Sequence, residues 1–228
     1  MFVILGATGK VGRTTIRELR AQGAPVRAVV RKSSDVEDLS ALGCEIAVAD
    51  LDETAALKSA IAGAETVQVI CPVRAQAADA VAEMAKTIDA MSNALKDVRP
   101  AKVLAISDYG AHLSEGTGIA AELLTDATRV AGPRIVHAEG PRRYDAIEVA
   151  ATLSKIVGRE IIAREIPQSD WIPALTRVGI SPSYARLVFE LYVAHNAGRI
   201  DVEPGATDIR FGTTELRAVF ASLSLQTC

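Results

Sequence analysis

In the first half of the chain, short runs of consecutive apolar residues alternate with longer segments whose apolar residues recur every three or four positions. The short runs are rich in β-branched residues and lack polar alternation, which is typical of parallel strands that helices cover on both faces. We therefore predict strands at Phe2–Leu5, Val26–Val30, Cys44–Ala49, Thr66–Cys71 and Lys102–Ser107.

The segments between these runs predict connecting helices. One covers Val11–Gln22 and places Ile16 and Leu19 on its inner face, and another begins at an N-cap Asp52 and ends at Gly63. Strands that alternate with helices of this length define an α/β fold with a doubly wound parallel sheet of the Rossmann type.

A longer helix, predicted from about Ala75 to Val98, carries a narrow apolar stripe with alternating steps of four and three residues. Such a stripe fits either the seam of a dimer or a helix that lies on its own sheet. We favour the second interpretation, and a homodimer stays open. The stripe consists of Ala77, Val81, Met84, Ile88, Met91, Leu95 and Val98.

The second half of the chain is mostly helical in pattern. A strand is predicted at Pro133–Ala138, and Asp145 with Glu148 forms the capping box of a helix that ends at Gly158. We assign residues 1–158 to the Rossmann domain and residues 159–228 to a small, mostly helical C-terminal lobe. Its predicted helices lie around Trp171, over Ser181–Ala194 and after Thr213 or Thr214.

Composition and charge narrow the class of protein. The net charge of −3 gives no basic surface for nucleic acid or an anionic membrane. Three cysteines without C-x-x-C spacing fit a reducing compartment. The chain begins in its first strand without a signal peptide, and it has no apolar stretch long enough for a membrane span. We expect a soluble cytoplasmic protein.

The first predicted strand runs directly into glycines spaced G-x-x-G-x-x-G. Gly6 permits a sharp turn, Gly9 lets a pyrophosphate lie against bare backbone, and Gly12 lets the next helix pack close to the sheet. The free N–H groups at the start of that helix face the anion. Glycines alone also fit an ordinary tight turn, but the flanking strand and helix favour dinucleotide binding. The predicted cofactor segment is Gly6-Ala7-Thr8-Gly9-Lys10-Val11-Gly12.

The end of the second predicted strand indicates which dinucleotide binds. An NAD site places a carboxylate about twenty residues after the glycines, where it binds the ribose 2′-hydroxyl. Arg31 and Lys32 stand there instead. A guanidinium suits a 2′-phosphate, so we predict NADP(H) as the cofactor, although the pair also fits an ordinary solvated loop.

The other strand ends complete the predicted cofactor site, because ligands bind outside the carboxyl ends of such strands. If the pyrophosphate binds at the glycines and the adenosine points toward Arg31, the nicotinamide half of the cofactor must lie at the ends of the fourth and fifth strands. Beyond those strands we expect the substrate near Trp171 and Tyr184, although a role in the hydrophobic core of the small lobe is slightly favoured for both residues. The remaining predicted cofactor residues are Asp50, Leu51, Cys71, Pro72 and Val73.

Two further stretches are Ser107-Asp108-Tyr109-Gly110-Ala111-His112 and Glu139-Gly140-Pro141-Arg142-Arg143-Tyr144. Together with the glycine segment, Arg31 and Asp50-Leu51, these stretches resemble the NmrA-like family of atypical short-chain dehydrogenase/reductases. The similarity covers nearly the whole chain. The resemblance implies an NADP(H)-binding Rossmann domain with a small substrate lobe. It also implies either a reductase of quinones or imines, or a non-catalytic redox sensor.

The chain departs from that family near residues 118–120, where Gly118-Ile119 leads straight into a segment that resembles a much later helix. At thirty or so residues per βαβ unit, roughly sixty to eighty residues are missing. Either an internal stretch is omitted from the sequence or the protein carries a deletion, and we favour the omission. The lost part would grip substrate and nicotinamide.

Catalytic candidates follow the fifth predicted strand. None of the four tyrosines has lysine four positions later, so the Tyr-x-x-x-Lys pair of ordinary short-chain dehydrogenases is absent. Ser107, Tyr109 and His112 are the residues placed to give a proton or hydrogen bond to a substrate, although this stretch also fits turn chemistry. No histidine has a carboxylate or cysteine at metal-ligand spacing, so no metal site is predicted.

Two functions follow. The first is an NADPH-dependent oxidoreductase that transfers hydride to a small, apolar carbonyl, quinone or imine. The second is a non-catalytic NADP(H) redox sensor that acts through a protein partner, which the missing Tyr-x-x-x-Lys pair favours. Sugar-nucleotide epimerisation is weakened, because it relies on the same missing tyrosine.

Overall fold

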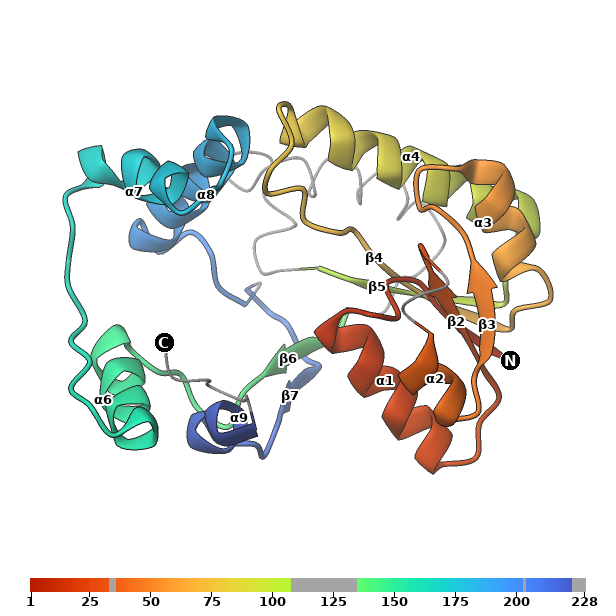
Figure 1. Cartoon of the computed structure of the whole chain (residues 1–228), viewed down its shortest axis with the longest axis horizontal. Helices are drawn as coiled ribbons and strands as arrows, with labels where there is room; N and C mark the ends of the chain where they lie inside the picture. The colour runs from red at the N-terminus through yellow and green to blue at the C-terminus, as the bar shows by residue number, and fades with distance from the viewer. Residues whose placement is uncertain (33–35, 108–134, 203, 223–228) are drawn as a thin grey trace.

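The computed structural model describes residues 1–32, 36–107, 135–202 and 204–222. Its centre is a parallel sheet of five strands in the order β3-β2-β1-β4-β5 (Figure 1). The predicted doubly wound sheet is confirmed, and each predicted strand end lies within one residue of the observed end. The strands are β1 (Phe2–Ile4), β2 (Val26–Val30), β3 (Glu45–Val48), β4 (Thr66–Ile70) and β5 (Lys102–Ile106).

The helices between these strands are α1 (Lys10–Ala21), α2 (Glu37–Ala41), α3 (Thr54–Ile61) and α4 (Ala80–Val98). The expected start of the long helix near Ala75 is wrong: α4 begins at Ala80, where the Asp79 carboxylate accepts a hydrogen bond from the Ala82 N–H. The short helix α2 was not expected, because five residues are too few to show a helical period.

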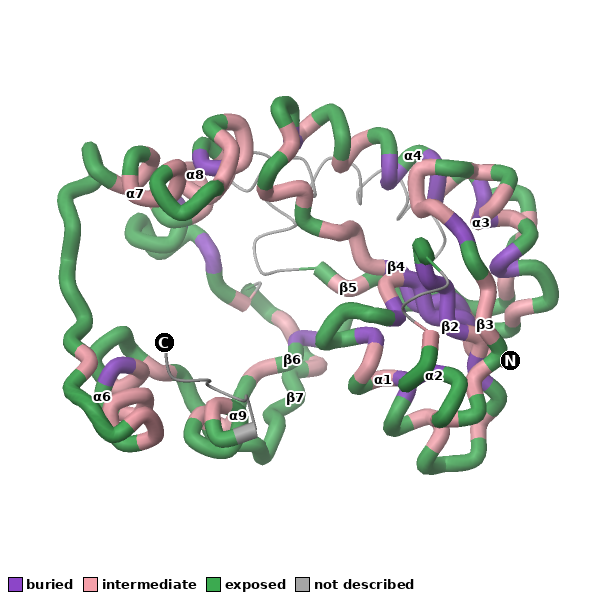
Figure 2. The backbone as a smooth tube through the Cα atoms, in the orientation of Figure 1, coloured by how far each residue is buried: buried purple, intermediate pink, exposed green. Residues whose placement is uncertain are grey.

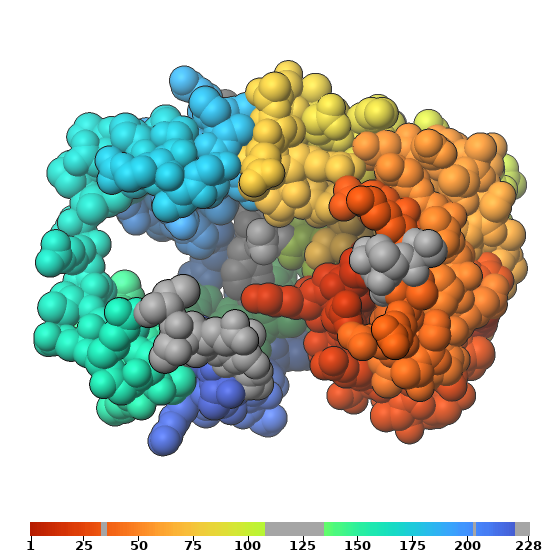
Figure 3. All heavy atoms as spheres, viewed as in Figure 1, coloured from red at the N-terminus to blue at the C-terminus, as the bar shows by residue number. Residues whose placement is uncertain are grey.

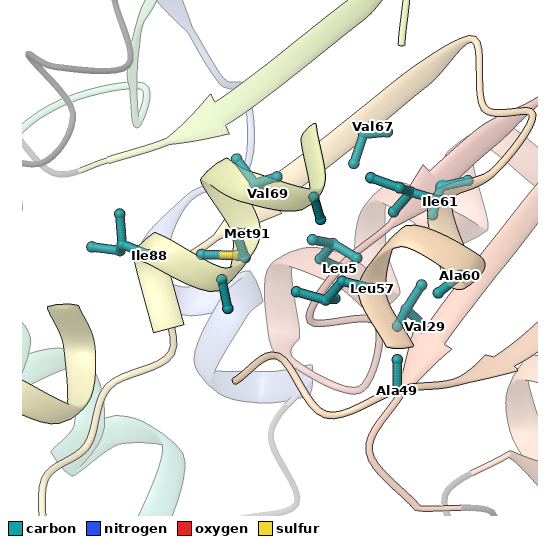
Figure 4. Close-up of a cluster of buried hydrophobic side chains, with 13 residues drawn as sticks. Leu5, Val29, Ala49, Leu57, Ala60, Ile61, Val67, Val69, Ile88 and Met91 are labelled. Atoms are coloured by element: carbon teal, nitrogen blue, oxygen red, sulfur yellow. The ribbon is translucent and has the colours of Figure 1, made fainter. Parts of the chain in front are cut away.

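Two apolar clusters cover the two faces of the sheet. On one face, Leu57 and Ile61 of α3 and Ile88 and Met91 of α4 pack against Val67 and neighbouring strand residues (Figure 4). Most buried positions belong to the strands and to the inner sides of these helices (Figure 2). The apolar stripe of α4 therefore lies on its own sheet, and a homodimer stays a prediction.

The edge strand β5 is much more exposed than the other strands of the sheet. Its Val103 and Leu104 side chains are 49% and 53% exposed, although both are apolar and β5 pairs along its whole length with β4. The chain junction near residues 118–120, Tyr109, His112 and the first two residues of the predicted strand Pro133–Ala138 lie outside the described residues.

The second half contains α6 (Ala146–Val157), α7 (Trp171–Arg177), α8 (Pro182–Asn196) and α9 (Leu216–Ser222). It also holds a small parallel sheet in which β6 (His137–Glu139) pairs with β7 (Ile209–Phe211). Figure 3 shows an opening in this half, with α7 and α8 along its upper side. The helical character matches the expectation, β7 was not expected, and the domain boundary at residue 158 stays a prediction.

Ion pairs brace the segment that leads from β6 into α6. Arg143 binds Glu139 at 2.9 Å and Asp201 at 2.6 Å, and its hydrogen bond lowers the pKa of the Asp201 carboxyl to about 2. Arg142 binds Glu148 and lies over the Tyr144 ring. These exposed contacts fasten β6 to the chain just before β7. Within the described residues, none of the helices combines the length and apolar character that crossing a bilayer requires.

The predicted capping box at the start of α6 is present. The Asp145 carboxylate accepts from the Glu148 N–H at 2.7 Å, and Glu148 accepts from the Asp145 N–H at 3.1 Å. We expect Asp145→Ala to lower the free energy of unfolding by about 1 kcal/mol, measured by urea denaturation. Asp145→Asn, which keeps an acceptor, is the control and should recover most of the loss; equal losses for both variants would contradict the cap assignment.

Candidate dinucleotide-binding site

The turn between β1 and α1 is closed by its three glycines. Gly6 has a φ of +71°, a backbone conformation that side chains disfavour, and its carbonyl accepts from the Gly9 N–H at 3.0 Å. A Cβ atom on Gly12 would stand 2.3 Å from the Gly6 oxygen and 2.9 Å from the Ala7 Cα. Gly12 therefore lets α1 approach the strand end, as the sequence predicts.

The first turn of α1 leaves its N–H groups available to an anion. The N-cap residue Gly9 offers no side-chain acceptor, and the first turn holds no acidic residue. Thr8, Gly9, Lys10 and Val11 are exposed. A Cβ on Gly9 would meet only the Gly6 oxygen, at 3.3 Å, so the outer side of Gly9 is open. Bare backbone, free donors and the positive end of the helix fit a pyrophosphate.

Arg13 fastens this turn to α2, a role that the sequence did not reveal. Its Nε donates to the Thr8 carbonyl at 3.0 Å, and its guanidinium binds Asp38 at 2.9 Å. The sequence pattern shows only an arginine on the polar side of a helix. The partner lies 25 residues away, at a distance where sequence spacing carries no signal.

Arg31 and Lys32 lie just beyond β2, on the same edge of the sheet as the glycine turn. Both side chains are exposed, and neither has a hydrogen-bond or ion-pair partner in the described part of the chain. Two cations with free donors at this position fit a phosphate group, because each can approach it without first breaking an ion pair.

The ends of β3 and β4 supply the other predicted cofactor residues. Asp50 and Leu51 are half-buried, and the Asp50 carboxylate accepts from the Asp52 N–H at 3.0 Å. After β4, Cys71 packs against the core while Val73 is 59% exposed. Burial raises the pKa of the Cys71 thiol, which Arg74 partly offsets. Cys71 thus stays a neutral, packed thiol, and Val73 faces solvent.

The candidate catalytic group is described only at Ser107, an exposed residue directly after β5. Because β4 and β5 are parallel neighbours, Ser107 shares the sheet edge with Cys71 and the glycine turn. Tyr109 and His112 are outside the described residues, so their roles stay predictions.

The helices α7 and α8 are anchored beside this edge. The Ser183 hydroxyl accepts from the Ala80 N–H at 3.0 Å, and the Ser181 N–H donates to the Ala75 carbonyl at 2.8 Å. Trp171 packs edge-on against Phe189 and Tyr192, with ring centres 5.8 and 5.9 Å away. Trp171 therefore belongs to an aromatic cluster between α7 and α8.

A parallel sheet whose first strand ends in this glycine turn, next to a strand-order reversal, defines a Rossmann-type nucleotide-binding protein. Comparison with known families gives the same class: the model of a family described as NAD(P)H-binding matches residues 6–126, more than half of the chain. The chain belongs to this NAD(P)H-binding family, in agreement with its resemblance to NmrA-like atypical short-chain dehydrogenase/reductases.

Known proteins share the fold at low identity. An NADPH-dependent quinone oxidoreductase from Escherichia coli, crystallised with NADPH, is 20% identical over 88% of this chain and 91% of its own, with a TM-score of 0.66. A nucleoside-diphosphate-sugar epimerase from Staphylococcus aureus is 14% identical over 96% and 99%, with a TM-score of 0.71. Identities this low define the fold and leave the reaction open.

A curated relative matches a shorter stretch. An NAD(P)H azoreductase from Xenophilus azovorans is 33% identical over 73 residues, which are 32% of this chain. The match spans about a quarter of the azoreductase's own length (26%). It supports the shared cofactor fold.

Proposed function

We propose that the protein is an NADPH-dependent oxidoreductase that reduces a small, mostly apolar carbonyl, quinone or imine. The observation that carries the proposal is the pairing of an open glycine cradle with two cations beyond β2 that have no partner among the described residues. The cradle, centred on Gly9, fits a pyrophosphate, and Arg31 with Lys32 fits the 2′-phosphate that distinguishes NADPH from NADH. Quinone and azo reductases among the similar proteins agree with this reaction class.

Each element of the chain has a separate task in this proposal. The α1 N-terminus holds the pyrophosphate, Arg31 and Lys32 hold the 2′-phosphate, and the Asp50 loop borders the adenosine. Bound NADPH supplies a hydride to the electrophilic carbon of the substrate. Ser107, Tyr109 or His112 gives the proton or hydrogen bond that the developing oxygen or nitrogen anion requires. The Cys71–Val73 loop borders the nicotinamide half of the cofactor, and the α7–α8 unit borders the substrate.

A substrate screen tests this function. We expect a panel of quinones, imines and azo compounds to include at least one that oxidises NADPH, followed by the loss of absorbance of the reduced nicotinamide. Tyr109→Phe or Ser107→Ala should lower kcat by about tenfold to a hundredfold and leave the dissociation constant of NADPH unchanged. A matched surface change, Ser59→Ala on α3, should leave kcat as it is.

The alternative is a non-catalytic sensor of the NADP(H) redox state, which the absent Tyr-x-x-x-Lys pair favours. Calorimetry with NADPH and NADP⁺ separates the two functions. A reductase turns over a substrate of the panel. A sensor turns over none and binds the two redox forms with clearly different affinities. Such a result would replace the reductase proposal.

A further inference from the structure

A compact polar network joins two loops that border the proposed cofactor site. Arg74, after β4, places its Nη2 atom 2.9 Å from an Asp52 carboxylate oxygen and 3.1 Å from the Thr87 hydroxyl. Asp52 follows β3, and the Thr87 hydroxyl donates to the same carboxylate oxygen. Thr87 is fully buried in α4, and the side chains of Arg74 and Asp52 are only 21% and 15% exposed.

The network continues through backbone hydrogen bonds toward both sides of the site. Asp52 donates its N–H to Asp50, on the adenosine side. On the other side, the Arg74 carbonyl accepts from the Ala77 N–H, and the neighbouring Ala75 carbonyl accepts from Ser181 at the start of α8. Arg74 thus lies between the Cys71–Val73 loop, which it directly follows, and the α8 anchor at Ala75.

Arg74 is poorly arranged for stability alone. Its Nε atom is buried, and it has no hydrogen-bond partner in the described residues. A buried donor without an acceptor costs stability, and a half-buried ion pair is often no more stabilising than apolar residues of the same size. The adjacent core of α3 and α4 is already closed by apolar contacts. These features favour a positional role for the network in addition to any contribution to stability.

We propose that Asp52 and Thr87, by holding the Arg74 guanidinium, position the β4–α4 loop for the nicotinamide half of the cofactor. The three are positioning residues, because they act through the Cys71–Val73 loop. This inference rests on the proposed NADPH site and extends it to residues that carry no cofactor motif. Arg74→Lys keeps the charge but shortens the side chain by one bond, so its nitrogen falls short of the Nη2 position that contacts both Asp52 and Thr87.

The test compares two ligands. In this proposal NADPH contacts the Cys71–Val73 loop through its nicotinamide half, whereas adenosine 2′,5′-bisphosphate carries only the half of the cofactor that faces Arg31 and the Asp50 loop. We expect Arg74→Lys to weaken NADPH binding about tenfold and to leave the bisphosphate affinity unchanged, both measured by calorimetry well below the melting temperature. Thr87→Val should weaken NADPH in the same direction, and Thr87→Ser, which retains the hydroxyl, should restore it.

Arg27→Lys is the matched control. Arg27 is also half-buried and binds a carboxylate, Glu45, at 2.8 Å, but it lies near the amino ends of β2 and β3, away from the cofactor edge. The Arg27→Lys substitution should lower the melting temperature without changing the affinity for NADPH. Equal NADPH affinity in wild type, Arg74→Lys and Thr87→Val would overturn the inference. Failure of the wild type to bind NADPH at all would instead refute the proposed function.

Discussion

Replacing Gly9 by valine is expected to abolish NADPH binding while the protein keeps its fold. Gly9 has a φ of −74°, which any residue can adopt, and an added Cβ would meet only the Gly6 oxygen, at 3.3 Å. The valine methyl groups would instead occupy the space beside the α1 N-terminus that the pyrophosphate needs. Circular dichroism should match the wild type, and quenching of NADPH fluorescence should disappear.

Two further variants distinguish the cradle from the fold. Gly9→Ala adds a single methyl group and should weaken NADPH binding less than valine does. Gly12→Val places its Cβ against the Gly6 carbonyl, so it should lower the free energy of unfolding by about 3 kcal/mol. A folded Gly9→Val protein that binds NADPH as tightly as the wild type would refute the cradle.

Wild-type protein is expected to bind NADPH more tightly than NADH, and Arg31→Ala should remove most of that difference. The exposed guanidinium is free of partners in the described residues, so its charge-assisted bonds to the 2′-phosphate are not offset by a lost ion pair. Their loss should cost about 1.5–3 kcal/mol, on the order of a tenfold to hundredfold rise in the dissociation constant. Titration calorimetry of both proteins with NADPH measures this change in the dissociation constant.

NADH binding is the internal control for Arg31→Ala, because NADH lacks the 2′-phosphate and should bind both proteins equally. Arg159→Ala removes the same charge beyond α6 and should change neither affinity, which excludes a general effect of net charge. Equal affinity of the wild type for NADPH and NADH would contradict the predicted cofactor preference.

The sequence predicts the central sheet closely, because its strands are continuous apolar runs bounded by glycine or polar residues. The β1–α1 turn is equally predictable, since the roles of Gly6 and Gly12 are local and depend only on backbone space. The capping box of Asp145 is local in the same sense. In each case the residues that determine the structure are neighbours in the chain.

The features that sequence reasoning missed depend on distant partners. Arg13 meets Asp38, and Arg74 meets Asp52 and Thr87, across 13 to 25 residues. The sequence predicts Asp52 only as a helix N-cap, a position that Glu53 occupies instead, and the other residues complete no motif. The strand β7 has three exposed residues and exists because its backbone pairs with β6. The substrate side of the site depends on Tyr109 and His112, whose assignment rests on the resemblance and on sheet topology.

The pairing of β6 with β7 also affects the order in which the chain folds. Residue 137 pairs with residue 209, so this small sheet must close a long loop before its few hydrogen bonds form. Loop closure costs entropy in advance of the contacts that repay it. The pairing of β1 with β2 joins residue 2 to residue 26 and closes a much shorter loop, whereas the pairing of β1 with β4 joins residue 2 to residue 66 and closes a loop almost as long. We therefore expect the β1–β2 pair to form before the β6–β7 closure.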